Sequence, residues 1–136
     1  MATIEADLFA YLSTFSGLTA LIGAGSSARV WPVNLDQDGQ LPAVLYKQVS
    51  NPKRYTHDGS SPWVTPRYQL TVVDTTYDGV LGVALQVNEA LSGYAGVLQA
   101  GGPKVVAKVV NELDDREPTS GRYRRYIDVV LEFQEV

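Results

Sequence analysis

The sequence predicts an α+β fold, with a mainly antiparallel five-strand sheet and two main helices packed on one face. Two observations predict it. Apolar residues recur at helical spacing in some segments and alternate with polar residues in others. These segments follow in the order ααβββαββ, and strands that are consecutive in sequence tend to pair antiparallel. The chain of 136 residues shows no internal repeat and no linker, so we expect residues 1–136 to form a single domain.

The N-terminal segment has the apolar spacing of a helix, with Ile4 and Leu8 on one face. We expect Thr3 to cap this helix, because a threonine side chain accepts hydrogen bonds from the first helical turn. Gly17 is expected to end the helix, and a short helical turn over residues 18–22 follows it.

Five segments rich in apolar, β-branched and aromatic residues are expected to be strands, at residues 29–33, 43–49, 64–73, 105–113 and 122–135. The last two flank a charged segment that contains Pro118 and Gly121, so they form a β-hairpin with a polar tip. About fourteen residues at ~3.3 Å each give the last strand a length of ~46 Å. We therefore expect the hairpin to project and to offer an edge or tip to a partner.

A second main helix is expected to start after Thr75 as its N-cap and to stop near Gly93. Val83 and Val87 lie off its main apolar stripe, which predicts burial on two sides, either deep in the domain or against a neighbouring subunit. The main stripe itself is made of Tyr77, Val80, Leu81, Ala84, Leu85 and Leu91.

Composition excludes several classes of protein. Eleven basic and fifteen acidic residues give a net charge of −4, which disfavours a phosphate-gripping nucleic-acid binder. The absence of cysteine excludes disulfides and thiolate metal sites, and it fits a reducing cytoplasm. We expect neither secretion nor a membrane span, because no signal peptide and no apolar run of ~20 residues is present.

The residue patterns predict no catalytic residue, no metal and no cofactor. His57 is the single histidine, and it shares one polar loop with Asp58 and Ser60, where three neighbours cannot easily adopt triad geometry. The acidic residues around Asp114 and Asp115 lie near a hairpin tip, where surface charges usually collect. The glycine pairs of the chain match no phosphate-binding fingerprint.

The segment over residues 50–62 is long and polar, and loops of this length are usually functional or disordered. Aromatic and arginine side chains are typical anchors of protein interfaces.

Acidic and basic residues of the terminal hairpin can form salt links across the hairpin or between subunits, and the sequence leaves both open. The candidate interface residues are Lys53, Arg54, Tyr55, His57, Asp58, Trp63, Arg67, Asp114, Asp115, Arg116, Arg122 and Arg124.

Several stretches, in order along nearly the whole chain, resemble a known protein family. They read RVWP at 29–32, LPAVLY at 41–46, YTHDG at 55–59, PRYQL at 66–70 and LSGYAG at 91–96. The terminal hairpin contributes ELDDRE at 112–117 and GRYRR at 121–125. Together they resemble the tail completion proteins of long-tailed bacteriophages, which are related in fold to tail terminators.

The resemblance implies a non-enzymatic virion protein that forms a ring, commonly a hexamer, at the head-proximal end of the tail tube. One face of the ring fits the last tube ring, and the other face differs, so tube growth stops. The implied partners are further copies of the chain, the tail tube protein and a head connector or head-closure protein. DNA only passes through the lumen, and no membrane is involved. The protein is expected in the virion tail near the neck, after assembly in the host cytoplasm.

Two alternatives remain open from the sequence. The first is another neck or connector role, such as a head-closure or minor tail protein, which microscopy of its position separates from a terminator. The second is a small hydrolase or ligand-binding α+β domain that uses His57. In that case His57→Ala abolishes an activity while the fold stays intact.

Overall fold

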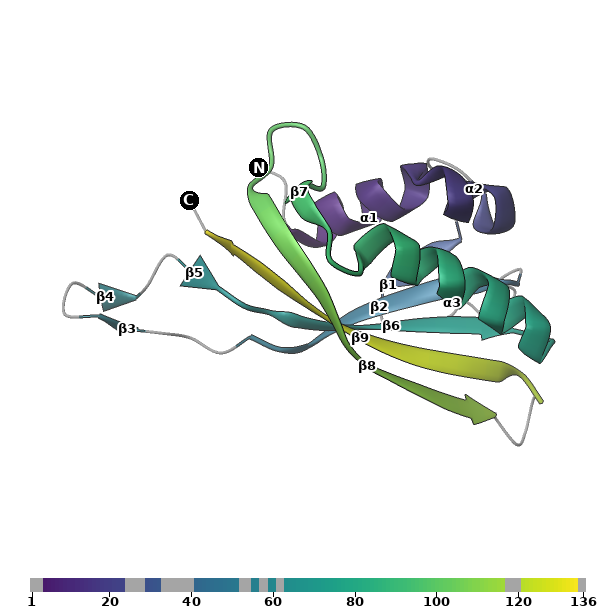
Figure 1. Ribbon diagram of the computed structural model, residues 1–136. Helices are drawn as coiled ribbons and strands as arrows, with labels where there is room; N and C mark the ends of the chain where they lie inside the picture. Colours follow the sequence, from purple (N-terminus) through teal and green to yellow (C-terminus); the bar gives the residue numbers. More distant parts are fainter. Residues whose placement is uncertain are drawn as a thin grey trace.

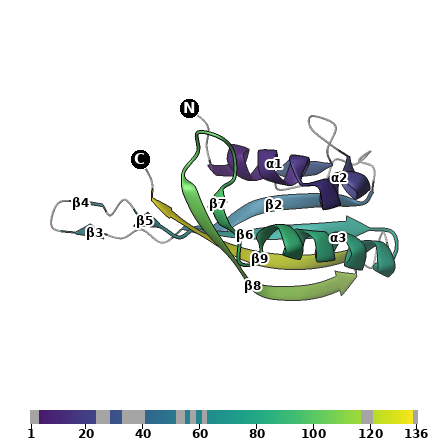
Figure 2. The same cartoon turned by 45° about the horizontal axis from the view of Figure 1, so that its top comes forward.

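The computed structural model describes residues 4–23, 29–32, 41–51, 55–56, 59–60, 63–116 and 121–134. The predicted α+β class is confirmed. Three helices lie on one face of a twisted sheet, and within the described ranges no helix covers the other face (Figure 1, Figure 2). The helices are α1 (Ile4–Thr14), α2 (Ser16–Ile22) and α3 (Tyr77–Leu91). None of the described helices is long and apolar enough to span a bilayer.

The main sheet contains seven described strands, where the sequence predicts five. Its order is β1-β2-β6-β9-β8-β7, with β5 also paired to β9. All its pairs are antiparallel except β1 with β2, which is parallel. The strand predicted at 64–73 is split in two, since Val64 belongs to the two-residue strand β5 and β6 begins at Arg67. The unpredicted strand β7 has three residues, too few to show a period. The strands are β1 (Val30–Pro32), β2 (Ala43–Ser50), β3 (Tyr55–Thr56), β4 (Gly59–Ser60), β5 (Trp63–Val64), β6 (Arg67–Asp74), β7 (Ala95–Val97), β8 (Lys104–Arg116) and β9 (Tyr123–Gln134).

The β3–β4 hairpin forms a separate two-stranded sheet. Tyr55 pairs with Ser60, and Thr56 pairs with Gly59. The expectation that residues 50–62 lack secondary structure is therefore wrong for these four residues. In both views the β3–β4 hairpin lies away from the helices and the main sheet, beyond the end of β5 (Figure 1, Figure 2).

The first two helices join differently from the prediction. α1 ends at Thr14, and α2 begins at Ser16, so Gly17 lies inside α2 instead of ending α1. Phe15 separates the helices because its backbone is extended, with φ −70° and ψ 118°. The expected cap Thr3 lies outside the described residues.

The N-cap of α3 is Thr76 and not Thr75. The Thr76 hydroxyl accepts a hydrogen bond from the Gly79 N–H at 3.1 Å, which satisfies a donor of the first turn. Asp74, at the end of β6, instead accepts a hydrogen bond from the Thr75 N–H at 2.7 Å. The sequence offers two adjacent threonines, and the residue that ends β6 decides between them.

The buried face of α3 also differs from the predicted stripe. Val83 and Val87 belong to the core-facing side, so α3 is buried on one side in the single chain, and cover of its other side by a neighbouring subunit stays a prediction. Tyr77 and Leu85 are instead exposed, at 40% and 57%. The side chains that α3 buries are Val80, Val83, Ala84, Val87, Ala90 and Leu91.

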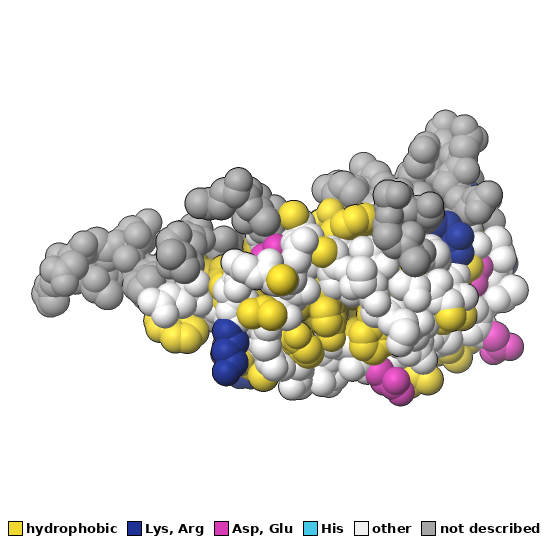
Figure 3. Space-filling model, turned by 90° about the horizontal axis from the view of Figure 1, so that it is seen from above, with side chains coloured by type: hydrophobic (Ala, Val, Ile, Leu, Met, Phe, Trp, Pro, Cys, Tyr) yellow, Lys and Arg dark blue, Asp and Glu magenta, His cyan; other side chains and the backbone are white. Residues whose placement is uncertain are grey.

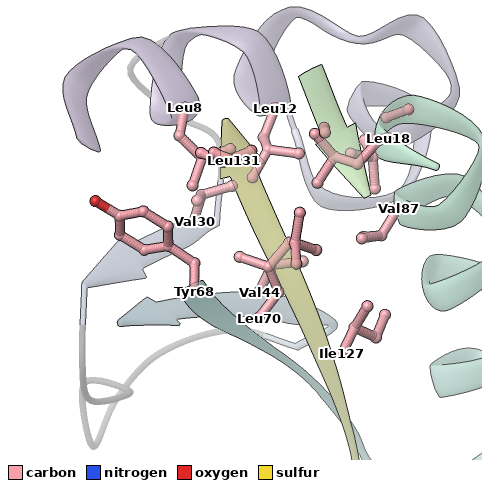
Figure 4. Close-up of a cluster of buried hydrophobic side chains, with 14 of the residues drawn as sticks. Leu8, Leu12, Leu18, Val30, Val44, Tyr68, Leu70, Val87, Ile127 and Leu131 are labelled. Atoms are coloured by element: carbon pink, nitrogen blue, oxygen red, sulfur yellow. The ribbon is translucent and has the colours of Figure 1, made fainter. Parts of the chain in front are cut away.

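The core lies between the helices and the sheet. Leu8 and Leu12 of α1 and Leu18 of α2 point toward Leu70 and Leu131 of the sheet (Figure 4). Each of these leucines is at most 1% exposed. Full burial of a leucine contributes roughly 1.5–3 kcal/mol relative to exposure, so this layer is the main source of stability.

Tyr68 closes one end of the core. Its hydroxyl donates to the Glu5 carboxylate at 2.9 Å and lies 3.2 Å from Gln48 Oε1. Burial, with the hydrogen bond to Glu5, raises the pKa of Tyr68 above its usual value. A buried tyrosine needs such a partner, and this one ties α1 to β6.

Candidate interaction surface

Four of the candidate residues, Lys53, Arg54, His57 and Asp58, lie outside the described residues. Tyr55 belongs to β3, which is described as a backbone strand of the β3–β4 hairpin. The geometry of any site that uses His57 therefore stays a prediction.

Trp63 lies where the chain rejoins the main sheet. It is the first residue of β5, pairs with Gln134 of β9, and is 54% exposed. Val49 lies at a register shift of β2 between Gln48 and Ser50, and it is 43% exposed. Both residues adjoin the segment that carries the β3–β4 hairpin, so exposed apolar surface accompanies its base.

Arg67 makes an ion pair within its own subunit. Its Nη2 lies 2.6 Å from Asp128 Oδ2, on the face of the sheet away from the helices. The side chains are 39% and 14% exposed. This pair links β6 to β9, and an exposed ion pair of this kind contributes about 1 kcal/mol at most.

Asp114 forms the centre of a polar cluster near the turn of the β8–β9 hairpin. Arg125 donates to both of its oxygens, at 2.6 and 3.0 Å, and Tyr77 Oη donates to it at 2.7 Å. The hydrogen bonds from Arg125, and to a lesser extent the one from Tyr77, hold the pKa of Asp114 below its usual value. The hydrogen bond to Asp114 in turn raises the pKa of Arg125. The cluster joins β8, β9 and the first turn of α3.

A second contact joins α3 to β8 about three turns farther along the helix. Asn88 Nδ2 donates to Glu112 Oε1 at 2.8 Å. Arg125 also lies near this carboxylate, at 3.9 Å. These polar links hold the exposed half of the hairpin against α3, where the hydrophobic core no longer reaches.

Two of the remaining hairpin candidates, Asp115 and Arg116, line a shallow hollow. The Arg116 guanidinium lies 5.4 Å from the centre of the Tyr123 ring, a cation–π distance. Asp115 is in register with Arg124, and Arg122 directly precedes β9. The hollow is lined by Tyr77, Asp114, Asp115, Arg116 and Tyr123.

The structure brings Asp114 together with Arg125, which the sequence reasoning missed. Val105 pairs with Phe133, and extending that register would place Asp114 opposite Arg124. A bulge between Val109 and Asn111 shifts the register by one residue, so Asp114 faces Arg125. The only sequence signal is the run of arginines, which does not say which of them faces the acid.

The second half of β8 has a strand neighbour on one side only. β7 pairs with β8 as far as Val106, and Ala107 bonds to Gly93 and Tyr94 at 3.1 and 2.8 Å. From Lys108 to Arg116, no described strand pairs with the side of β8 away from β9. We call this stretch, residues 108–116, the β8 edge.

Exposed apolar side chains accompany the β8 edge. Val110 is 48% exposed and Leu113 is 61% exposed. On the helical face, apolar side chains gather in the middle, and most charged side chains in view lie toward the outline (Figure 3). Exposed apolar surface beside an unpaired strand edge is a feature of interaction sites.

A family model described as Tail completion protein gp17 matches residues 6–133 of the chain. The chain belongs to this family. It is a structural protein of the phage tail, located in the virion tail, and not an enzyme. The resemblance noted in the sequence is thereby confirmed.

A chain of known structure gives an independent comparison of fold for this tail completion family member. It comes from a structure titled "Virion of native gene transfer agent (GTA) particle", with a TM-score of 0.76 and 16% sequence identity. The match covers 96% of this chain and 94% of the other. No curated protein sequence matches this chain.

Across the described ranges, no group of three or more His, Asp or Glu side chains is placed to hold a metal ion. Asp114 and Glu112 accept hydrogen bonds from Arg125 and Asn88, respectively. Contact of the exposed end of the β8–β9 hairpin and of the β3–β4 hairpin with other proteins stays a prediction.

Proposed function

We propose that this protein forms a hexameric ring at the head-proximal end of the tail tube. The ring ends tube polymerisation and provides the surface for head-tail joining. The observation that carries the proposal is the family match over residues 6–133. The likeness of fold to a chain of a gene transfer agent virion supports a place in a virion particle.

The arrangement of surfaces supports assembly of identical copies. The β3–β4 hairpin and the Arg116 end of β8 lie at opposite ends of the molecule (Figure 1). Two different surfaces on one chain allow a heterologous contact, which generates a closed ring when the rotation between copies closes. The proposed interface residues are those named from the sequence: Lys53, Arg54, Tyr55, His57, Asp58, Trp63, Arg67, Asp114, Asp115, Arg116, Arg122 and Arg124.

The proposed partners are further copies of the chain, the tail tube protein and a head connector or head-closure protein. DNA passes through the lumen without being held. The net charge of −4 supports this, because tight binding to a phosphate backbone requires clustered positive charge.

The mass of the purified chain in solution, followed by imaging of the particles, tests the ring. We expect closed rings, either alone or upon addition of tail tubes. A chain that stays a monomer at high concentration and does not dock on tubes would contradict the proposal. Rings that localise elsewhere in the particle than the tube end would favour another neck or minor tail role.

A further inference from the structure

The β3–β4 hairpin pairs with no other strand among the described residues. Each of its strands has two residues, and it belongs to a sheet separate from the main one. Figures 1 and 2 both place it beyond the body of the domain. An isolated two-stranded hairpin is marginally stable at best in water, so pairing with a strand of another copy would stabilise this hairpin.

The β8 edge offers main-chain groups of the kind that an added strand uses. On β9, the Leu131 N–H points away from β8 and donates to Pro66 O at 3.0 Å. Ala107 lies opposite Leu131 on β8, and its N–H and C=O likewise point away from β9, because they bond to Tyr94 and Gly93. In an antiparallel pair, every second residue directs its N–H and C=O groups away from the neighbouring strand. Ile127 and Arg125 lie at this spacing from Leu131 on β9, and they lie opposite Glu112 and Asp114. Glu112 and Asp114 therefore also direct their N–H and C=O groups away from β9. A second strand can pair there.

Charge favours the β3–β4 hairpin as that strand. On the helix side of the β8 edge, α3 contains no Lys or Arg and carries Asp78 and Glu89. With Glu112 and Asp114 these make four carboxylates, against the two guanidinium groups of Arg116 and Arg125. The segment over residues 50–62 has the opposite balance, with Lys53 and Arg54 against Asp58 alone.

We propose that the β3–β4 hairpin of one copy adds as a strand to the β8 edge of a second copy, and that this is the subunit contact of the ring. The proposal rests on the ring of the proposed function. Main-chain pairing supplies the bonds, and the added strand covers Val110 and Leu113, which are 48% and 61% exposed in the single copy. The two surfaces lie at opposite ends of the molecule (Figure 1). Each copy can therefore bind one neighbour through its β3–β4 hairpin and another neighbour through its β8 edge.

Engineered cysteines test the contact, since the natural chain contains none. Thr56→Cys combined with Leu113→Cys, and separately with Val110→Cys, places one thiol on the β3–β4 hairpin and one on the β8 edge. Under oxidation, assembled rings of at least one pair are expected to give covalent oligomers on a non-reducing gel. The matched control is Thr56→Cys with Leu21→Cys, because Leu21 is 39% exposed on α2. This control is expected to remain monomeric on the same gel.

A charge variant gives a second readout. Leu113→Arg is expected to raise the subunit concentration needed for half assembly by about tenfold or more, because it places a cation where the added strand packs. Leu21→Arg serves as its control and is expected to leave this concentration unchanged.

The outcomes separate the two proposals. Rings that form without any cross-link between position 56 and the β8 edge would overturn the strand contact and leave the ring intact. The same conclusion follows if the Leu21 control cross-links as well as the test pairs. A chain that never assembles in the mass measurement would overturn the ring itself.

Discussion

The two halves of β8 have different surroundings. In the first half, Val105 and Ala107 are fully buried beneath the helices, and β7 and β9 flank the strand. In the second half, every residue from Val110 to Arg116 is exposed, and among the described strands only β9 lies beside it. One continuous strand thus contributes to the core at one end and presents an edge at the other.

The difference shows where each kind of interaction stabilises the molecule. The first half depends on apolar burial, which contributes most of the folding free energy. The second half depends on hydrogen bonds of Asp114 and Glu112 to Arg125, Tyr77 and Asn88 at the surface. Exposed polar contacts contribute little to stability, but they fix the position of the edge.

The largest effect is expected from a matched pair of leucine substitutions. Leu131 is fully buried on β9, whereas Leu113 on the β8 edge is 61% exposed. Leu131→Ala is expected to lower the free energy of unfolding by roughly 2–5 kcal/mol, because it leaves a cavity in the core. Leu113→Ala is expected to change it by less than about 0.5 kcal/mol. Urea denaturation of the unassembled subunit, followed by circular dichroism, measures both.

Equal losses of stability in the two variants would contradict the distinction between the buried part of the sheet, which stabilises the fold, and the exposed β8 edge, which does not. A stable Leu113→Ala subunit that assembles more weakly than the natural chain would sharpen it, because stability and assembly would then depend on different residues.

A smaller, pH-dependent effect is expected at Asp114. Its pKa is lowered from the usual 3.8, mainly by the hydrogen bonds from Arg125 and then by that from Tyr77. A carboxyl with a depressed folded-state pKa stabilises the fold fully above its unfolded-state pKa, and this contribution is lost as the pH falls below that value through the folded-state pKa. Asp114→Asn is therefore expected to be less stable than the natural chain at neutral pH and equally stable in strong acid.

The size of that effect is limited by solvent. The Asp114 side chain is 39% exposed, so the difference at neutral pH is expected to stay below about 1 kcal/mol. Glu89→Gln on the exposed side of α3 removes the same charge and serves as the control. A stability difference for Asp114→Asn that does not change between neutral and acid pH would show that the ion pair with Arg125 does not contribute to stability.

Local periodicity was sufficient to predict the strongly patterned elements. Tyr68, Leu70 and Val72 alternate with polar residues, and all three are buried on β6 as expected. Apolar character alone misled on α3, because Leu85 is apolar and yet lies outside the buried face. Helix orientation depends on the packing of the sheet beneath it, which the sequence of one helix does not contain.

The candidate site was harder to predict, because it depends on register. Asp114 and the arginine run at the start of β9 were identified as interface candidates, but the partner of Asp114 is set by the bulge at Val109 and Asn111. A bulge has no reliable local sequence signal, and it moves every later pair by one residue. The β8 edge also follows from topology, because β7 ends its pairing at Val106.

The length of tails made without this protein tests the central claim most directly. If the chain caps the tail tube, particles from a strain that lacks its gene should have abnormally long or headless tails, and supplying the chain should restore the natural length. Electron microscopy of both preparations gives the two length distributions. Tails of natural length joined to heads in the absence of the protein would contradict the account.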